Sequence, residues 1–111
     1  MKWYTKLSAA LEYLAIGTVD YNHTKVDVGD SSTQILAANA DRKYALFINN
    51  SDEDIYMKAD GAAAVVGRGI VLKADGGSFE MSPRLGNLTT SAVRGIHNDT
   101  GNKGLLVVEG E

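Results

Sequence analysis

Beyond Gly17 the chain consists of short segments in which apolar and polar residues alternate, separated by turn-forming residues. Alternation with a period of two places successive side chains on opposite faces of a β-strand. About eight such segments follow one another, at intervals of roughly ten residues. The 12 glycines in 111 residues fit this pattern, because glycine supplies the positive φ angles that tight turns need. The sequence therefore predicts a single all-β domain, a β-sandwich or jelly-roll-like body or a small barrel.

The expected strands can be placed by the alternation of their residues. They cover residues 24–28, 33–37, 43–49, 55–59, 70–73, 78–81, 88–96 and 105–109. The segment 43–49 is apolar on both of its faces, so we expect it at the centre of a sandwich. One face is formed by Tyr44, Leu46 and Ile48, and the other by Ala45 and Phe47.

Two of the turns predict which strands pair. The polar residues 50–54 predict a turn after which segment 55–59 pairs back on segment 43–49. The run Ala74-Asp75-Gly76-Gly77 predicts a hairpin between the strands on either side, because glycine accepts the φ angles of a hairpin turn.

The N-terminal residues follow a different period. Leu7, Ala10, Leu11 and Leu14 lie at i, i+3, i+4 and i+7, which predicts a short amphipathic helix over residues 5–16. Gly17 is a residue that commonly ends a helix. We therefore expect an N-terminal helical arm at residues 1–20 and a β-sandwich domain at residues 21–111.

A helix this short is marginal in isolation, so its apolar stripe is expected to dock on another surface. In one alternative it packs across one end of its own sandwich. In the other it anchors the domain to a neighbouring subunit, where aromatic side chains are favoured. The candidate contact residues are Trp3, Tyr4, Leu7, Leu11 and Leu14.

Charge and cysteine content limit the partners that we expect. The net charge is −3, and the lysines and arginines are scattered, with no basic run longer than Arg42-Lys43. A nucleic-acid partner is therefore not expected, since phosphate binding needs clustered basic residues. The absence of cysteine excludes disulfides and thiolate ligands. Lys6 and Glu12 interrupt the apolar N-terminal residues, so we expect neither a secretory signal nor a membrane span.

Each candidate for a chemical site is weak. His23 and His97 belong to no metal-binding spacing, and His97 is expected where a strand ends in a turn. The acidic run 52–54 lacks the spacing of a calcium loop and fits a solvated turn. The run Gly67-Arg68-Gly69 lacks the third glycine of a dinucleotide-binding fingerprint, because Leu72 stands in its place. We therefore expect a protein that is not an enzyme and has no metal or cofactor.

Several segments carry a resemblance to a known group of proteins. They are Gln34–Asn39, Arg42–Leu46, Asn49–Asp52, Gly69–Leu72, Gly76–Met81 and Leu105–Gly110. Over residues 26–111 the sequence resembles small tailed-bacteriophage virion proteins of the head-decoration or head-fibre type. The resemblance implies a β-rich module on the capsid exterior, often a trimer, that reinforces the shell or presents a surface to the environment.

The expected function is accordingly structural. The resemblance implies that the chain decorates or stabilises a bacteriophage capsid by binding its outer surface. The major capsid protein is then its partner, a homo-oligomer such as a trimer its state, and the exterior of the virion its location. An alternative is a glycan- or receptor-binding module displayed on a phage tail or fibre. The third and weakest alternative is a small hydrolase with catalytic residues from distant segments.

Overall fold

The computed structural model describes residues 19–111; the predicted helix at 5–16 lies outside these residues. Residues 19–111 form eight strands and contain no helix long and apolar enough to cross a membrane. The strands are β1 (Tyr21–Val28), β2 (Thr33–Leu36), β3 (Tyr44–Asn49), β4 (Ile55–Lys58), β5 (Ile70–Leu72), β6 (Gly77–Met81), β7 (Val93–His97) and β8 (Lys103–Gly110).

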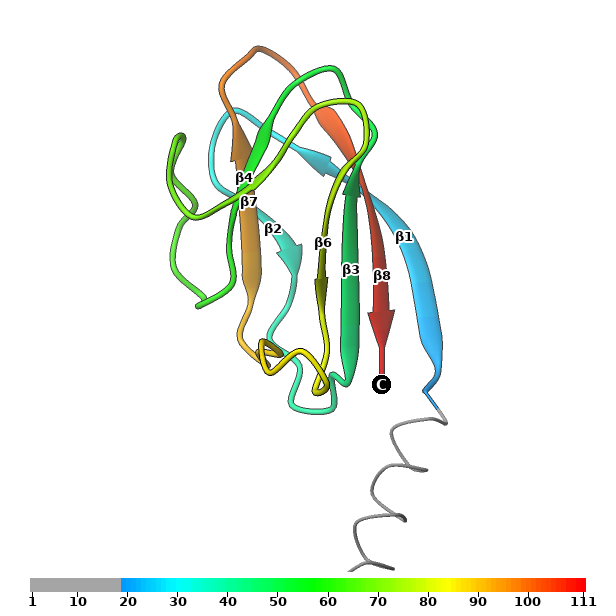
Figure 1. The fold of residues 1–111 in the computed structure, drawn as a ribbon. Helices are drawn as coiled ribbons and strands as arrows, with labels where there is room; N and C mark the ends of the chain where they lie inside the picture. The colour runs from blue at the N-terminus through cyan, green and yellow to red at the C-terminus, as the bar shows by residue number, and fades with distance from the viewer. Residues whose placement is uncertain (1–18) are drawn as a thin grey trace, which may run out of the picture.

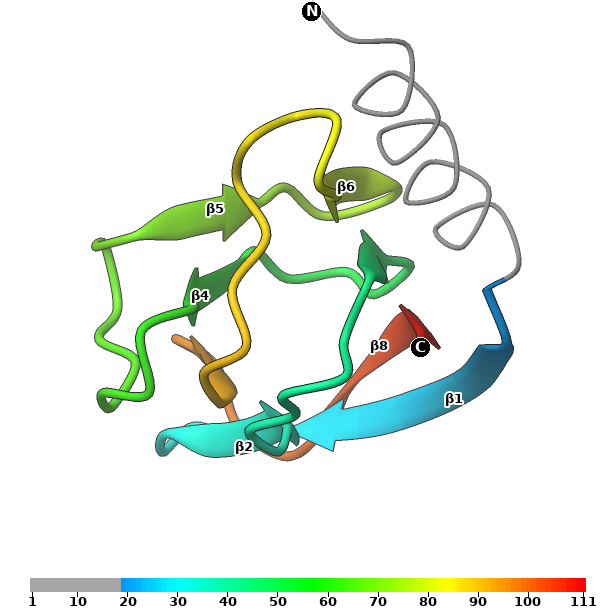
Figure 2. The same ribbon diagram turned by 90° about the horizontal axis from the view of Figure 1, so that it is seen from below.

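The strands form two four-stranded antiparallel sheets. One sheet has the order β1-β8-β3-β6 and the other the order β2-β7-β4-β5. Figures 1 and 2 show the two sheets as the two layers of a sandwich. The predicted all-β class is thereby confirmed, and so is the central position of segment 43–49, because β3 has β8 and β6 on its two sides.

The core lies between the sheets and follows the alternation of the sequence. Every second residue of β3 and of β7 is buried, as expected for strands with one face toward a core. Both sheets contribute to the buried apolar cluster, which consists of Val28, Ile35, Ala45, Phe47, Ile55, Met57, Leu72, Met81, Val93, Leu105 and Val107.

The predicted strand at 88–96 is only half correct, because β7 begins at Val93. The backbone carbonyls of residues 89–91 accept hydrogen bonds, but the donors do not belong to a neighbouring strand. Arg42 Nη1 donates to the carbonyls of Thr89 and Ser91, and the Asn39 amide donates to Thr90. These bonds replace strand pairing over residues 89–91.

The predicted pairing of 55–59 with 43–49 is wrong, since β3 and β4 belong to different sheets. The loop between them is an arch that crosses the sandwich, and the buried side chain of Asn49 holds it. Asn49 Nδ2 donates to the carbonyls of Glu53 and Leu72, each at 2.8 Å, and Asn49 Oδ1 accepts from the Ser51 amide and hydroxyl.

The predicted hairpin at 74–77 is also wrong, because β5 and β6 belong to different sheets. The turn does contain positive φ angles, 61° at Asp75 and 117° at Gly76, whereas Gly77 already belongs to β6. Two backbone amides of this turn donate to the β3–β4 arch. The Asp75 amide donates to the Ser51 carbonyl, and the Gly76 amide donates to the Asn49 carbonyl. Turn residues thus specify that the chain reverses, but not which sheet it enters next.

One buried side chain joins two connections and strand β8 at the end of the sandwich near the C-terminus. Arg42 is 3% exposed, and its Nε lies 2.8 Å from Glu109 Oε2. Its remaining donors reach carbonyls of the β2–β3 and β6–β7 connections, those of Ala37, Thr89 and Ser91, at 2.7–2.9 Å. Every one of these bonds is charge-assisted, which makes them stronger than neutral hydrogen bonds.

Replacing Arg42 with methionine is expected to lower the free energy of unfolding by about 3–5 kcal/mol, because Glu109 and three carbonyls lose their partner in a buried place. Urea denaturation would measure this loss. Arg68→Met is the control, since Arg68 is exposed in the β4–β5 connection, and its effect should stay within about 0.5 kcal/mol. Equal, small losses for both variants would contradict the structural role of Arg42.

Candidate interaction surface

The outward face of the β1-β8-β3-β6 sheet carries four apolar side chains side by side. Strand register places Val108 beside Leu46 and Leu106 beside Ile48. Directly paired residues share a face of a sheet, and the alternate residues Phe47 and Val107 are buried in the core. The four side chains therefore point away from the core. They are called the apolar outer face below.

Polar residues border this apolar outer face. On β1, His23 pairs with Val108 and Lys25 with Leu106, and on β6 Glu80 pairs with Leu46. Leu106 is 40% exposed although it lies in the middle of the sheet. An exposed apolar group framed by polar residues is the usual arrangement of a contact surface.

The other sheet presents a different outward face. Tyr56 lies there between Val71 and Ile96, but the next row pairs Lys58 directly with Arg94. Gln34 continues this polar row on β2. The apolar residues are thus limited to one row on this sheet, whereas they form two neighbouring rows on the first.

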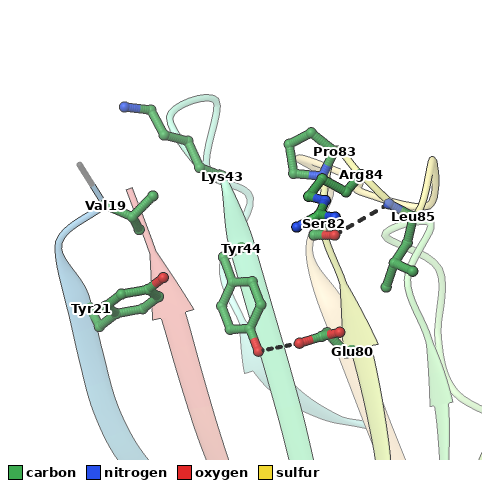
Figure 3. Close-up of a pocket in the computed structure, with 9 residues that line it drawn as sticks. All are labelled: Val19, Tyr21, Lys43, Tyr44, Glu80, Ser82, Pro83, Arg84 and Leu85. Carbon is green, nitrogen blue, oxygen red and sulfur yellow. Dashed lines mark hydrogen bonds between the residues drawn. The ribbon is translucent and has the colours of Figure 1, made fainter. Parts of the chain in front are cut away.

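A pocket of about 410 Å³ lies at one end of the apolar outer face (Figure 3). Its walls come from three separate segments of the chain and combine aromatic, aliphatic and charged side chains. The lining residues are Val19, Tyr21, Lys43, Tyr44, Glu80, Ser82, Pro83, Arg84 and Leu85.

The floor of this pocket depends on a glycine between two tyrosines. Gly110 pairs with Tyr21 on one side and with Tyr44 on the other. A Cβ atom on Gly110 would collide with Val19 and press against both tyrosines, so only glycine leaves room for them. The two rings meet edge to face over this position, with centroids 5.6 Å apart and an interplanar angle of 89°. This geometry is favourable for aromatic pairs.

Tyr44 is held in place by a carboxylate. Its hydroxyl donates to Glu80 Oε2 at 2.6 Å, as Figure 3 shows. This hydrogen bond, together with burial and the nearby negative charge of Glu80, raises the pKa of Tyr44 to about 12. The phenol therefore keeps its proton, and Tyr21 is left as the more accessible ring at 55% exposure.

A second hollow of about 390 Å³ lies on the same face. It is lined by His23, Thr24, Lys25, Ile48, Leu106, Val107 and Val108. Three of the four residues of the apolar outer face contribute to it. Both hollows open on the outward face of the β1-β8-β3-β6 sheet. The first contains Tyr21 and Tyr44, and the second contains His23 and Leu106.

Among the residues that the sequence suggested for chemistry, His97 and the acidic run have structural partners, and His23 is exposed on β1. His97 ends β7 as predicted and is buried, with Nδ1 accepting the Asp99 amide and Nε2 lying 2.7 Å from the Gly101 carbonyl. The first bond fixes the tautomer, so Nε2 carries the proton and donates. Among residues 19–111, no group of three or more histidine and carboxylate side chains is placed to hold a metal ion.

The acidic turn at 52–54 is tied to lysines. Asp52 accepts from Lys103 Nζ, and Asp54 accepts from Lys73 Nζ, each at 2.8 Å. The hydrogen bond from Lys103 lowers the pKa of Asp52, and those from Lys73 and the Ala74 amide lower that of Asp54. Its carboxylates therefore connect the arch to neighbouring strands at the surface.

The candidate contact residues from the sequence all precede the described residues: Trp3, Tyr4, Leu7, Leu11 and Leu14. Sequence reasoning missed the apolar outer face and the tyrosine pocket. A signal for the face was present, because segments 43–49 and 105–109 are apolar at successive positions. In segment 43–49 this pattern predicts a central position in the sandwich, and it does not by itself indicate an exposed face.

Replacing Glu80 with glutamine is expected to lower the pKa of Tyr44 from about 12 toward its ordinary value of 10.0, because the carboxylate charge is removed. NMR titration of the tyrosine Cζ carbons would measure it. The raised pKa also means that stability from this pair is complete below pH 10 and falls as the pH rises toward 12. Asp27→Asn, on the exposed edge strand β1, should leave the pKa unchanged. An unshifted Tyr44 in the Glu80 variant would contradict the assignment.

Comparison of the chain with protein-family models, with curated proteins and with solved structures gave no match.

Proposed function

We propose that this chain is a non-catalytic structural protein of a bacteriophage virion, which binds the outer surface of the capsid through its apolar outer face. The observation that carries the proposal is a block of two neighbouring apolar rows in the middle of a sheet, in which Leu106 is 40% exposed and Leu46, Ile48 and Val108 are half-buried. The resemblance of residues 26–111 to head-decoration proteins gives the partner, the major capsid protein.

The winding of the chain supports a jelly roll as the finer description of the fold. Of the connections between successive strands, only β4–β5 stays within one sheet, and all others pass from one sheet to the other. Jelly rolls consist of eight strands in two sheets and are frequent in viral capsid and lectin domains. A fold alone does not define a function, so the proposal depends on the surface.

The size of the apolar outer face indicates how it would bind. The whole outward face of the four-stranded sheet, with strands spaced about 4.8 Å apart and the longest strands of eight residues rising about 3.3 Å each, offers at most about 500 Å². A standard interface buries about 800 Å² on each partner. Binding through this face alone would therefore be weak for one copy. A symmetric shell compensates for this, because linked copies bind with greater avidity than single ones.

Leu106→Lys is expected to weaken capsid binding about tenfold or more, because it places a charge in the centre of the contact. The measurement is co-sedimentation of the full chain with mature and immature heads of the source phage. Val71→Lys is a matched control, since Val71 is 46% exposed on the outward face of the other sheet. The proposal is supported if the wild type and Val71→Lys saturate the heads at a fixed copy number and Leu106→Lys does not. Heads that bind neither the wild type nor the control contradict it.

The tyrosine pocket favours one alternative, a glycan-binding module. Tyr21 offers an exposed ring, Glu80 an oriented carboxylate, and Lys43 and Arg84 add positive charge. Aromatic faces with a few polar groups are typical of small-ligand pockets. On a glycan array this alternative expects saturable binding that Tyr21→Ala removes and Leu106→Lys preserves. An array without a binding glycan would remove the alternative.

A further inference from the structure

We propose that the chain's own residues 1–18 cover the apolar outer face in the free protein. The apolar stripe of Leu7, Leu11 and Leu14 would lie against Leu46, Ile48, Leu106 and Val108. The covering of the face does not depend on the proposed function. If the proposed function holds as well, capsid binding through this face begins with displacement of the segment.

The place where the described chain begins points to this occupant. Val19 lies over Gly110 and lines the tyrosine pocket, on the same side of the sheet as the apolar outer face. Two backbone hydrogen bonds fix the neighbouring residue, from the Asp20 amide to the Glu111 carbonyl at 2.8 Å and from the Glu111 amide to the Asp20 carbonyl at 3.0 Å. The preceding residues are therefore attached at the edge of this face.

The length of the segment matches the face. If residues 3–18 continue at the helical rise of 1.5 Å per residue, they extend about 24 Å from Val19. The eight residues of β8 extend about 26 Å at 3.3 Å each. To run back along the sheet, the chain must reverse just before Val19, and Gly17 provides a residue that tolerates the positive φ of a reversal.

The alternative occupant, the same face of a second copy, is less well matched. Two faces of about 500 Å² would bury about 1,000 Å² in total, which is below the range of stable interfaces. A segment of the same chain needs much less contact, because a short connection gives it an effective concentration in the millimolar range. The apolar stripe also has to dock somewhere, since a helix of this length is marginal in isolation.

Trp3 provides the test, because it is the only tryptophan of the chain and lies in the segment. In the full chain its emission is expected to be blue-shifted and weakly quenched by acrylamide. Leu106→Asp should shift the emission to the red and increase quenching severalfold. Val71→Asp, on the outward face of the opposite sheet, should change neither value.

A second variant separates docking from folding. Leu11→Asp leaves the sandwich sequence intact and should produce the same red shift as Leu106→Asp, while circular dichroism shows an unchanged β-sheet signal. A wild-type Trp3 that is already exposed and insensitive to both variants overturns the proposal. So does a blue shift that disappears on dilution together with a fall in sedimentation coefficient, because the segment would then lie on another copy. A wild-type chain that does not bind capsids, but whose Trp3 emission shifts as expected in both variants, would refute only the proposed function.

Discussion

Strand β8 is the element on which the rest of the structure depends. It is the last strand of the chain, yet it pairs with the first strand over eight residue pairs and with β3 over six. The sheet is therefore complete only when the C-terminus has been inserted between two segments that precede it by more than fifty residues. Such long-range pairing closes the sandwich at the cost of large loop-closure entropy. The same insertion brings Val19 beside Gly110, on the outward face of this sheet.

The positions of the strands could be predicted from the sequence, but their partners could not. Alternation reports which side chains share a face, and it placed segments 33–37, 43–49 and 55–59 within a residue or two of the observed strands. It contains no information on whether the next strand joins the same sheet. Both predicted hairpins were arches, because Asn49 and the Gly76 amide bind across the sandwich instead of along one ladder. The bonds that join Asn49 to Leu72 and to Gly76 connect residues more than twenty positions apart, which a local pattern does not reveal.

The candidate site was harder to predict than the fold, for a related reason. The tyrosine pocket combines residues near 20, 44 and 80–85, and only the strand order brings these together. The run Leu105-Leu106-Val107-Val108 was correctly predicted to be a strand. However, the sequence does not distinguish an apolar residue that a second sheet covers from one that is exposed to solvent. Leu105 and Val107 are buried, while Leu106 is 40% exposed. The contact residues proposed at 3–14 lie outside the described residues and remain predictions.

The exposure of the apolar outer face sets a physical condition that any function must meet. Burial of apolar surface is worth about 25 cal/mol per Å², so about 500 Å² of partly apolar sheet favours association of several kilocalories per mole. A protein that leaves such a surface in water is prone to nonspecific association. The flanking strand β1 counters edge-to-edge pairing with charged residues such as Lys25 and Asp27, but these do not cover the face itself. A cover that exchanges for a partner would reduce this tendency. A short amphipathic segment of the same chain would serve as such a cover, because its contact is small and its attachment makes it always available.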